Sequence, residues 1–163
     1  MAKMKKLISL FAFALMFACG NAFSFDLVIS GDIDKYTDPK SKSYVFSETE
    51  LMRMPVREIR TSTAWTAESR FEGVPILDLL KKVGARGKAI TVYTLDDYYE
   101  DIPVSDFEKY GTILAYKMNG KMLSLKNFGP LFVIYPRDTG GAELSGPLYS
   151  TRFLWQVYKI VVK

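Results

Sequence analysis

The chain has 163 residues, with 22 Lys and Arg against 18 Asp and Glu, a formal net charge of +4 and no histidine. Its single cysteine, Cys19, lies in an apolar run near the N-terminus. Beyond that run, the composition excludes thiolate nucleophiles, Ser–His–Asp triads, His or Cys metal ligands and imidazole acid–base groups. Any chemistry therefore rests on carboxylates, hydroxyls, Arg, Lys, Tyr, Trp or a bound small molecule.

Residues 1–24 are typical of a secretory signal peptide. Three lysines precede an apolar stretch at residues 7–18, which is too short to span a bilayer, and small residues before Phe25 fit a signal peptidase site. We therefore expect a mature chain that begins at Phe25 and lies in the periplasm. A retained membrane anchor is one alternative. Lipoprotein processing at Cys19 is the other, and the bulky Phe17 disfavours it.

The expected signal also carries much of the positive charge. It holds three of the 22 basic residues and none of the 18 acidic ones, which leaves 19 basic against 18 acidic residues and a net charge of +1. A nearly neutral domain gives no support for nucleic-acid binding. We expect residues 25–163 to form one domain that is long enough to bury its own core without a disulfide.

The first half of this domain is predicted to contain short strands around one helix. Its strands are expected from β-branched or alternating apolar residues at 25–31, 44–46 and 56–63. A polar loop follows the first strand. Ser47 and Glu50 form a capping box, which predicts a helix ending near Met54.

The second half is predicted to contain a helix at residues 75–83, with Pro in its first turn and Gly84 as its C-terminal stop. A short helical turn is expected at residues 106–110. Asn119-Gly120 predicts a two-residue hairpin turn. The remaining strands are expected at 89–95, 112–118, 121–123, 131–135 and 155–162. The predicted class is α+β, with more strand than helix.

Several segments, in this order and at this spacing, resemble the molybdopterin-binding domain of the sulfite oxidase fold. The resemblance covers roughly residues 56–162. The segments that carry it include Thr61-Ser62-Thr63-Ala64-Trp65-Thr66, Phe71-Glu72-Gly73-Val74-Pro75, Asp96-Asp97-Tyr98, Asn119-Gly120, Gly129-Pro130-Leu131 and Trp155-Gln156. The resemblance implies a single α+β domain of that fold, with mixed sheets and short helices.

Enzymes of this family bind molybdenum through a cysteine in the loop after an early strand. The corresponding loop here, residues 59–65, contains Thr and Ser, whose hydroxyls are poor substitutes for a soft thiolate. The chain's size, signal and lack of cysteine are more similar to a small exported branch of the family. That resemblance implies a reduced pterin, rather than molybdopterin, bound without metal. It also implies regulation of a membrane-bound cyclic-di-GMP enzyme through its periplasmic domain.

A pterin is a flat ring with a 2-amino-4-oxo edge, so its recognition needs a stacking surface, a carboxylate and hydrogen-bond donors. Trp65 is expected to be the stacking wall, and Asp97 beside Tyr98 the carboxylate. Arg152 is expected to contact the carbonyl, the ring or an anionic tail. The further candidates, which the family pattern places at the same site, are Tyr149, Trp155, Arg60, Thr61 and Thr63. No catalytic or metal-binding residue is expected.

Each of these candidates has a plainer structural interpretation. Trp65 and Trp155 fit a partly buried core, Asp97 fits a solvated acidic turn, and Arg152 fits an ion pair with a nearby carboxylate. The neighbouring Glu100 is expected to be a surface residue.

Three functions remain open. The first is a non-catalytic periplasmic pterin-binding protein that acts as a sensory module for a membrane-bound signalling protein. The second is a molybdopterin-dependent oxidoreductase, or a subunit of one, that lacks the usual cysteine. The third is an interaction domain whose cleft has degenerated.

Overall fold

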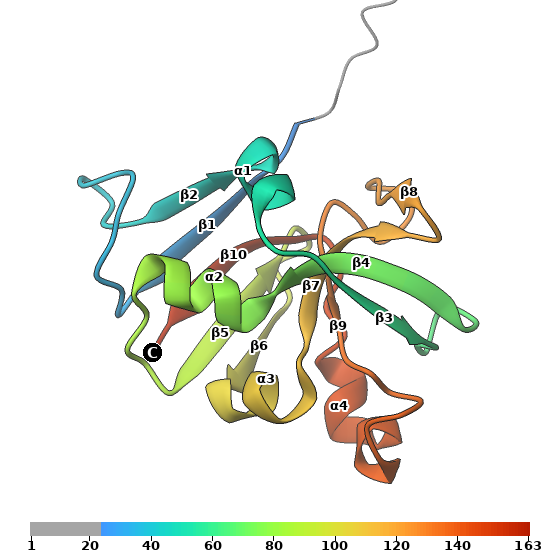
Figure 1. Ribbon diagram of the computed structural model, residues 1–163. Helices are drawn as coiled ribbons and strands as arrows, with labels where there is room; N and C mark the ends of the chain where they lie inside the picture. The colour runs from blue at the N-terminus through green and yellow to red at the C-terminus, as the bar shows by residue number, and fades with distance from the viewer. Residues whose placement is uncertain (1–23) are drawn as a thin grey trace, which may run out of the picture.

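Two five-stranded sheets organise residues 24–163, which are the residues that the computed structural model describes (Figure 1). The expected signal peptide, apart from Ser24, and Cys19 lie outside the described residues. Within the described range, no helix is long and apolar enough to cross a bilayer.

The first sheet brings the two ends of the domain together. Its strands, in spatial order, are β2 (Tyr44–Ser47), β1 (Asp26–Gly31), β10 (Val157–Val162), β5 (Ala89–Thr94) and β6 (Tyr99–Pro103). The pair β1 and β10 is parallel and the other pairs are antiparallel, so this sheet is mixed, as predicted. The last strand of the chain therefore lies in the centre of the sheet, and β6 lies at its edge.

The second sheet is antiparallel throughout. It contains β3 (Arg57–Thr61), β4 (Ser69–Pro75), β7 (Ile113–Met118), β8 (Lys121–Met122) and β9 (Phe132–Ile134), with β7 pairing β4, β8 and β9. The predicted hairpin turn between β7 and β8 is confirmed. Asn119 and Gly120 have φ of 52° and 77°, the left-handed values that such a turn requires.

Two predicted helices, the one that ends near Met54 and the one at residues 75–83, are confirmed. Helix α1 (Glu48–Arg53) begins after Ser47, whose side chain accepts a hydrogen bond from the Glu50 backbone N–H at 3.2 Å. The Glu50 carboxylate accepts from the Tyr44 hydroxyl at 2.6 Å rather than completing the capping box. Helix α2 (Ile76–Val83) ends at Gly84, which has φ of 67°. The buried face of α2 consists of Ile76, Leu79, Leu80 and Val83.

Three short helices complete the domain: α3 (Val104–Tyr110), the 3-10 turn η1 (Ala142–Ser145) and α4 (Pro147–Thr151). In Figure 1, α3 and α4 lie near one another at the same end of the molecule. A buried ion pair between them, described below, confirms that they are neighbours. The sequence analysis predicted α3 in part, and it predicted neither η1 nor α4.

The core is built from the apolar faces of both sheets and α2. Its largest fully buried side chains are Tyr135, Phe46, Phe71, Phe107 and Phe132. The alternation in β1 is confirmed, because Leu27 and Ile29 are fully buried between more exposed neighbours. Burial of these side chains is the main favourable term in folding, since this domain contains no disulfide.

Two strands were not predicted, and several others, such as β3, β9 and β10, are shorter than expected. Strands β4 and β6 are rich in charged or polar residues, and their pairing partners stabilise them. In β6, Asp101 accepts from Thr91 at 2.5 Å and from Lys163 at 3.0 Å. Strand β10 begins at Val157 rather than at residue 155. Gln156 has φ of 56°, which interrupts the extended backbone.

Candidate ligand-binding pocket

A pocket of about 410 Å³ lies where three segments meet. These segments are the β5–β6 turn (residues 95–98), helix α4 with the chain that follows it, and the loop after β3. The volume is within the range of small-molecule sites. One part of the lining is apolar and aromatic: Trp65, Phe153, Leu154 and Trp155. The other part is polar: Thr94, Asp96, Tyr98, Ser150 and Thr151.

The two tryptophans of the chain meet edge to face at this pocket. The rings of Trp65 and Trp155 have centroids 4.3 Å apart and an interplanar angle of 79°. Trp155 packs against the buried Phe132, whereas 44% of Trp65 is exposed. The pair therefore joins the core to the pocket mouth and presents aromatic surface to a flat ligand.

The loop that carries Trp65 is held by hydroxyl groups. Thr63 Oγ1 accepts from the backbone N–H of Trp65 at 3.1 Å and of Thr66 at 3.0 Å. Thr61 Oγ1 accepts from the Asp138 backbone N–H at 3.2 Å. Thr61 and Thr63 are both buried and do not line the pocket. Their positions indicate that they support the Trp65 loop.

Asp96 provides the carboxylate of the pocket. Its Oδ1 accepts from Thr94 Oγ1 at 2.5 Å and from the Tyr98 backbone N–H at 3.3 Å. The hydrogen bond from Thr94, followed by that from Tyr98, lowers the pKa of Asp96 below its ordinary value of 3.8. Asp96 is therefore ionised at neutral pH. Among the hydrogen bonds of the described residues, none involves its Oδ2.

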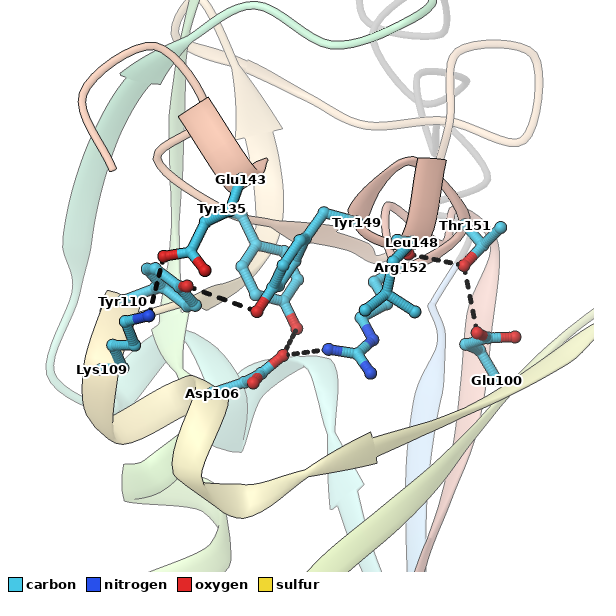
Figure 2. Close-up of polar contacts among 10 residues, drawn as sticks. All are labelled: Glu100, Asp106, Lys109, Tyr110, Tyr135, Glu143, Leu148, Tyr149, Thr151 and Arg152. Carbon is cyan, nitrogen blue, oxygen red and sulfur yellow. Dashed lines mark hydrogen bonds and ion pairs between the residues drawn. The ribbon is translucent and has the colours of Figure 1, made fainter. Parts of the chain in front are cut away.

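Glu100 holds two walls of the pocket together from outside the lining. Its Oε1 accepts from Thr151 Oγ1 at 3.0 Å, and its Oε2 accepts from the Tyr98 hydroxyl at 3.4 Å. Figure 2 shows Thr151 of α4 directed toward Glu100 of β6. Partial burial, then the charge of Glu100, raise the pKa of Tyr98. The sequence analysis left Glu100 as a surface residue. The two-residue spacing of Tyr98, just before β6, and Glu100, within it, is the signal that could have identified it, because residues two apart lie on the same side of an extended chain.

Arg152 and Tyr149 lie in a separate buried cluster next to the pocket (Figure 2). Arg152 is 8% exposed and donates from Nη1 to Asp106 Oδ2 at 2.5 Å. Its guanidinium lies 5.1 Å from the centre of the Tyr149 ring. The Tyr135 hydroxyl donates to the same Asp106 oxygen at 3.3 Å. The charge that was expected to meet a ligand is therefore paired with a buried carboxylate of α3.

Asp97 and Arg60 also lie outside the pocket lining. Asp97 has φ of 65° and is exposed in the turn, where the left-handed backbone puts Asp96 rather than Asp97 on the lining. Arg60 forms an exposed ion pair with Glu68 at 3.4 Å. Of the predicted residues, the structure brings Trp65, Tyr98 and Trp155 together. Ligand binding by any of these residues stays a prediction.

Residues 41–144 match a family described as the oxidoreductase molybdopterin binding domain. The chain belongs to this family. The predicted fold, a single domain of the sulfite oxidase type with mixed sheets and short helices, is confirmed. The matched range contains Trp65, Asp96 and Tyr98 but ends before α4 and β10, so five of the nine lining residues lie beyond it.

The fold is also found in a solved structure of a longer chain. The chain is similar to a chain of the sulfane dehydrogenase SoxCD from Paracoccus pantotrophus, with a TM-score of 0.63 and 17% sequence identity. The match covers 85% of this chain and 38% of that chain. At this identity the likeness shows the fold alone. A comparison with curated protein sequences found no match.

The donor set of this family member does not fit a thiolate-bound molybdenum centre. The loop after β3 contains hydroxyls, and those of Thr61 and Thr63 are already bonded to the backbone. In the part of the chain that the structure describes, no group of His, Cys, Asp and Glu side chains could hold a metal ion. The pocket lining contains one carboxylate and neither Lys nor Arg, so it offers no cation to a phosphate.

Proposed function

We propose that this protein is a non-catalytic periplasmic binding protein for a pterin, a reduced pterin rather than molybdopterin. We further propose that it acts as a sensory module for a membrane-bound signalling protein that controls cyclic-di-GMP. One observation carries the proposal. The chain belongs to a pterin-cofactor family and keeps a pocket with an aromatic pair and an ionised carboxylate, but its loop after β3 lacks the thiolate.

The pocket matches the chemistry of a pterin ring in two respects. The exposed part of the Trp65 indole provides a surface on which a bicyclic ring can stack. Asp96 Oδ2 is available to accept from the 2-amino group or a ring N–H, a charge-assisted and directional bond. The ligand would thus bridge the second sheet, which carries Trp65, and the first sheet, which carries Asp96.

The sensory part of the proposal relies on α4. Ser150 and Thr151 line the pocket, while Tyr149 and Arg152 of the same segment pack on α3. A ligand that binds one position of α4 better than another would shift the population of that position, and a partner on this surface could detect the shift.

Isothermal titration of the purified protein with 7,8-dihydroneopterin tests the binding. We expect a dissociation constant in the micromolar range or below. Trp65→Ala is expected to weaken the affinity about tenfold, because an aromatic contact contributes about 1.4 kcal/mol. Leu148→Ala is the matched control, because Leu148 is exposed on α4 but does not line the pocket. The proposal would be refuted if a folded protein gave no binding heat at a ligand concentration about 100 times the expected dissociation constant.

The sensory role has its own test in cells. Deletion of the protein is expected to change the cyclic-di-GMP level, and a Trp65→Ala chain is expected to restore that level less well than a Leu148→Ala chain. Equal restoration by both chains would favour an interaction domain with a degenerated cleft.

Family membership favours a second candidate, a molybdopterin-dependent oxidoreductase or its subunit. Metal analysis of protein purified from its native host distinguishes the two. Stoichiometric molybdenum would overturn the pterin-binding proposal in favour of the enzyme.

A further inference from the structure

The hydroxyl groups of the pocket all point their protons away from a ligand. The single hydroxyl proton of Thr151 has two acceptors, the Glu100 carboxylate at 3.0 Å and the Leu148 carbonyl at 2.8 Å, and Ser150 donates to the Gly146 carbonyl at 3.1 Å. A carboxylate and a carbonyl oxygen can only accept, so the direction of each bond is set by its acceptor.

The β5–β6 side of the pocket shows the same arrangement. Thr94 donates to Asp96 at 2.5 Å, with the Tyr98 carbonyl as its second acceptor at 2.9 Å. The Tyr98 hydroxyl donates to Glu100. These four hydroxyls therefore offer only lone pairs to a ligand, as does Asp96 Oδ2. The remaining side-chain donors of the lining are the indole N–H groups of the two tryptophans.

The charges on this wall are negative. Asp96 faces the pocket, and Glu100 lies behind Tyr98 and Thr151. Among the ion pairs of the described residues, none involves either carboxylate. An anionic group entering the pocket would therefore face two carboxylates without a compensating cation, at a distance shorter than the screening length of physiological salt.

We propose that the pocket, with Asp96 as its specificity-determining residue, selects flat heterocycles that present N–H donors and rejects those that carry a phosphate. This inference rests on the proposed function and deepens it. The ligand's amino groups and protonated ring nitrogens face Asp96 and the hydroxyl lone pairs. Its carbonyl group faces an indole N–H or the pocket mouth. Molybdopterin, which carries a phosphate, belongs to the rejected class.

Four probes test the inference by titration calorimetry: 7,8-dihydroneopterin, its monophosphate ester, 2,4-diaminopteridine and the matched 2-amino-4-oxopteridine. The diamino compound replaces the carbonyl acceptor with an amino donor and loses the N3–H of the oxo compound, which leaves it with one more N–H and no carbonyl. We therefore expect it to bind about tenfold more tightly than the corresponding 2-amino-4-oxo pteridine. We expect the phosphate ester to bind at least tenfold more weakly than dihydroneopterin at low salt, with a smaller difference at high salt.

Two matched variants locate the determinant. Asp96→Asn removes the charge but retains an oxygen for Thr94, so it is expected to fold and to reduce both preferences to within about threefold. Asp97→Asn removes the neighbouring charge in the same turn, at a φ of 65° that Asn tolerates, and is expected to leave both preferences unchanged.

The outcomes separate the inference from the proposed function. Failure of all four probes to bind a folded protein would refute the proposed function and the inference with it. Binding of the phosphate ester as tightly as the free alcohol, or equal binding of the diamino and oxo compounds, would refute the inference alone. A larger effect of Asp97→Asn than of Asp96→Asn would also overturn the assignment of Asp96.

Discussion

Arg152 at the end of α4 and Asp106 in α3 form an ion pair between side chains that are each only 10% exposed. The two residues are 46 positions apart in the chain, and the Tyr135 hydroxyl donates to the same carboxylate oxygen of Asp106. Arg152 Nε is also buried and has no hydrogen-bond partner among the described residues. This end of the domain therefore depends on one paired charge.

Asp106→Ala is expected to lower the free energy of unfolding by about 3–5 kcal/mol, because it leaves the Arg152 charge buried without its partner. Urea unfolding measures the change. A double variant, Asp106→Leu with Arg152→Met, is expected to recover much of the loss, since it removes both charges and keeps the volume. A loss below about 1 kcal/mol in the single variant would show that Arg152 reaches solvent when the pair is broken.

Thr63→Val is expected to weaken ligand binding without touching the pocket. The change removes the oxygen that accepts from the backbone N–H groups of Trp65 and Thr66, and it keeps the side-chain shape. We expect a loss of about 1–2 kcal/mol in stability and a several-fold loss in pterin affinity, because the Trp65 loop is released. Thr63→Ser keeps the oxygen and serves as the control. Equal affinity of the two variants would contradict the supporting role of Thr63.

Glu100→Gln is expected to change what the pocket accepts more than how stable the domain is. The neutral amide accepts through one oxygen only, so either Thr151 or Tyr98 can turn its proton into the pocket. We expect the discrimination against the dihydroneopterin phosphate ester to fall several-fold, with a change in unfolding free energy within about 1 kcal/mol. Calorimetry and urea unfolding measure the two effects. Unchanged discrimination would show that Glu100 does not orient these hydroxyls.

Stability is expected to be flat between about pH 5.5 and pH 8, because the chain has no histidine. On the acid side, hydrogen bonds from Thr91 and then Lys163 lower the pKa of Asp101 below 3.8. Hydrogen bonds from Lys109 and then Tyr110 lower that of Glu143 below 4.5. The folded state holds these protons less tightly than the unfolded chain. The contribution of these two carboxylates to stability is thus fully present above their pKa in the unfolded chain. It is lost as the pH falls through their pKa in the folded state.

At alkaline pH, stability is expected to fall as the pH rises, because two tyrosines have a raised pKa in the folded state. Burial, followed by Glu50, raises the pKa of Tyr44 from 10.0 to about 12, and burial followed by Glu143 raises that of Tyr110 to about 12. The stabilisation by these neutral phenols is present below about pH 10 and is lost as pH rises through about 12. Urea unfolding at a series of pH values measures both limbs. Asp101→Asn is expected to flatten the acid limb, and a step near pH 6.5 would contradict the prediction.

Local chemistry predicted the elements whose signals are contained within a few residues. The Asn119-Gly120 turn, the Ser47 cap and the Gly84 stop were all confirmed, because each depends on backbone angles or hydrogen bonds between near neighbours. Strand β6 and helix α4 carry no such signal. An acidic edge strand and a helix of five residues form only where tertiary partners hold them.

In the candidate site, too, some residues could be predicted from local sequence and others could not. Trp65 and Tyr98 stand beside turns, so their place on the pocket followed from local pattern. The ion pair of Arg152 could not be predicted in this way, because its partner Asp106 is distant in the chain and the residues around Arg152 give no sign of it. The choice of Asp96 over Asp97 depended on a single left-handed residue.

The sequence by itself determined that residues 25–163 contain no thiolate or imidazole and where the Asn119-Gly120 turn, the Ser47 cap and the Gly84 stop lie. These properties depend on residue type and local backbone preference. Only the tertiary structure decided which carboxylate neutralises Arg152 and that Thr151 of α4 lies against Glu100 of β6 across the pocket wall. Each of these depends on contacts between groups that folding alone brings within hydrogen-bond distance.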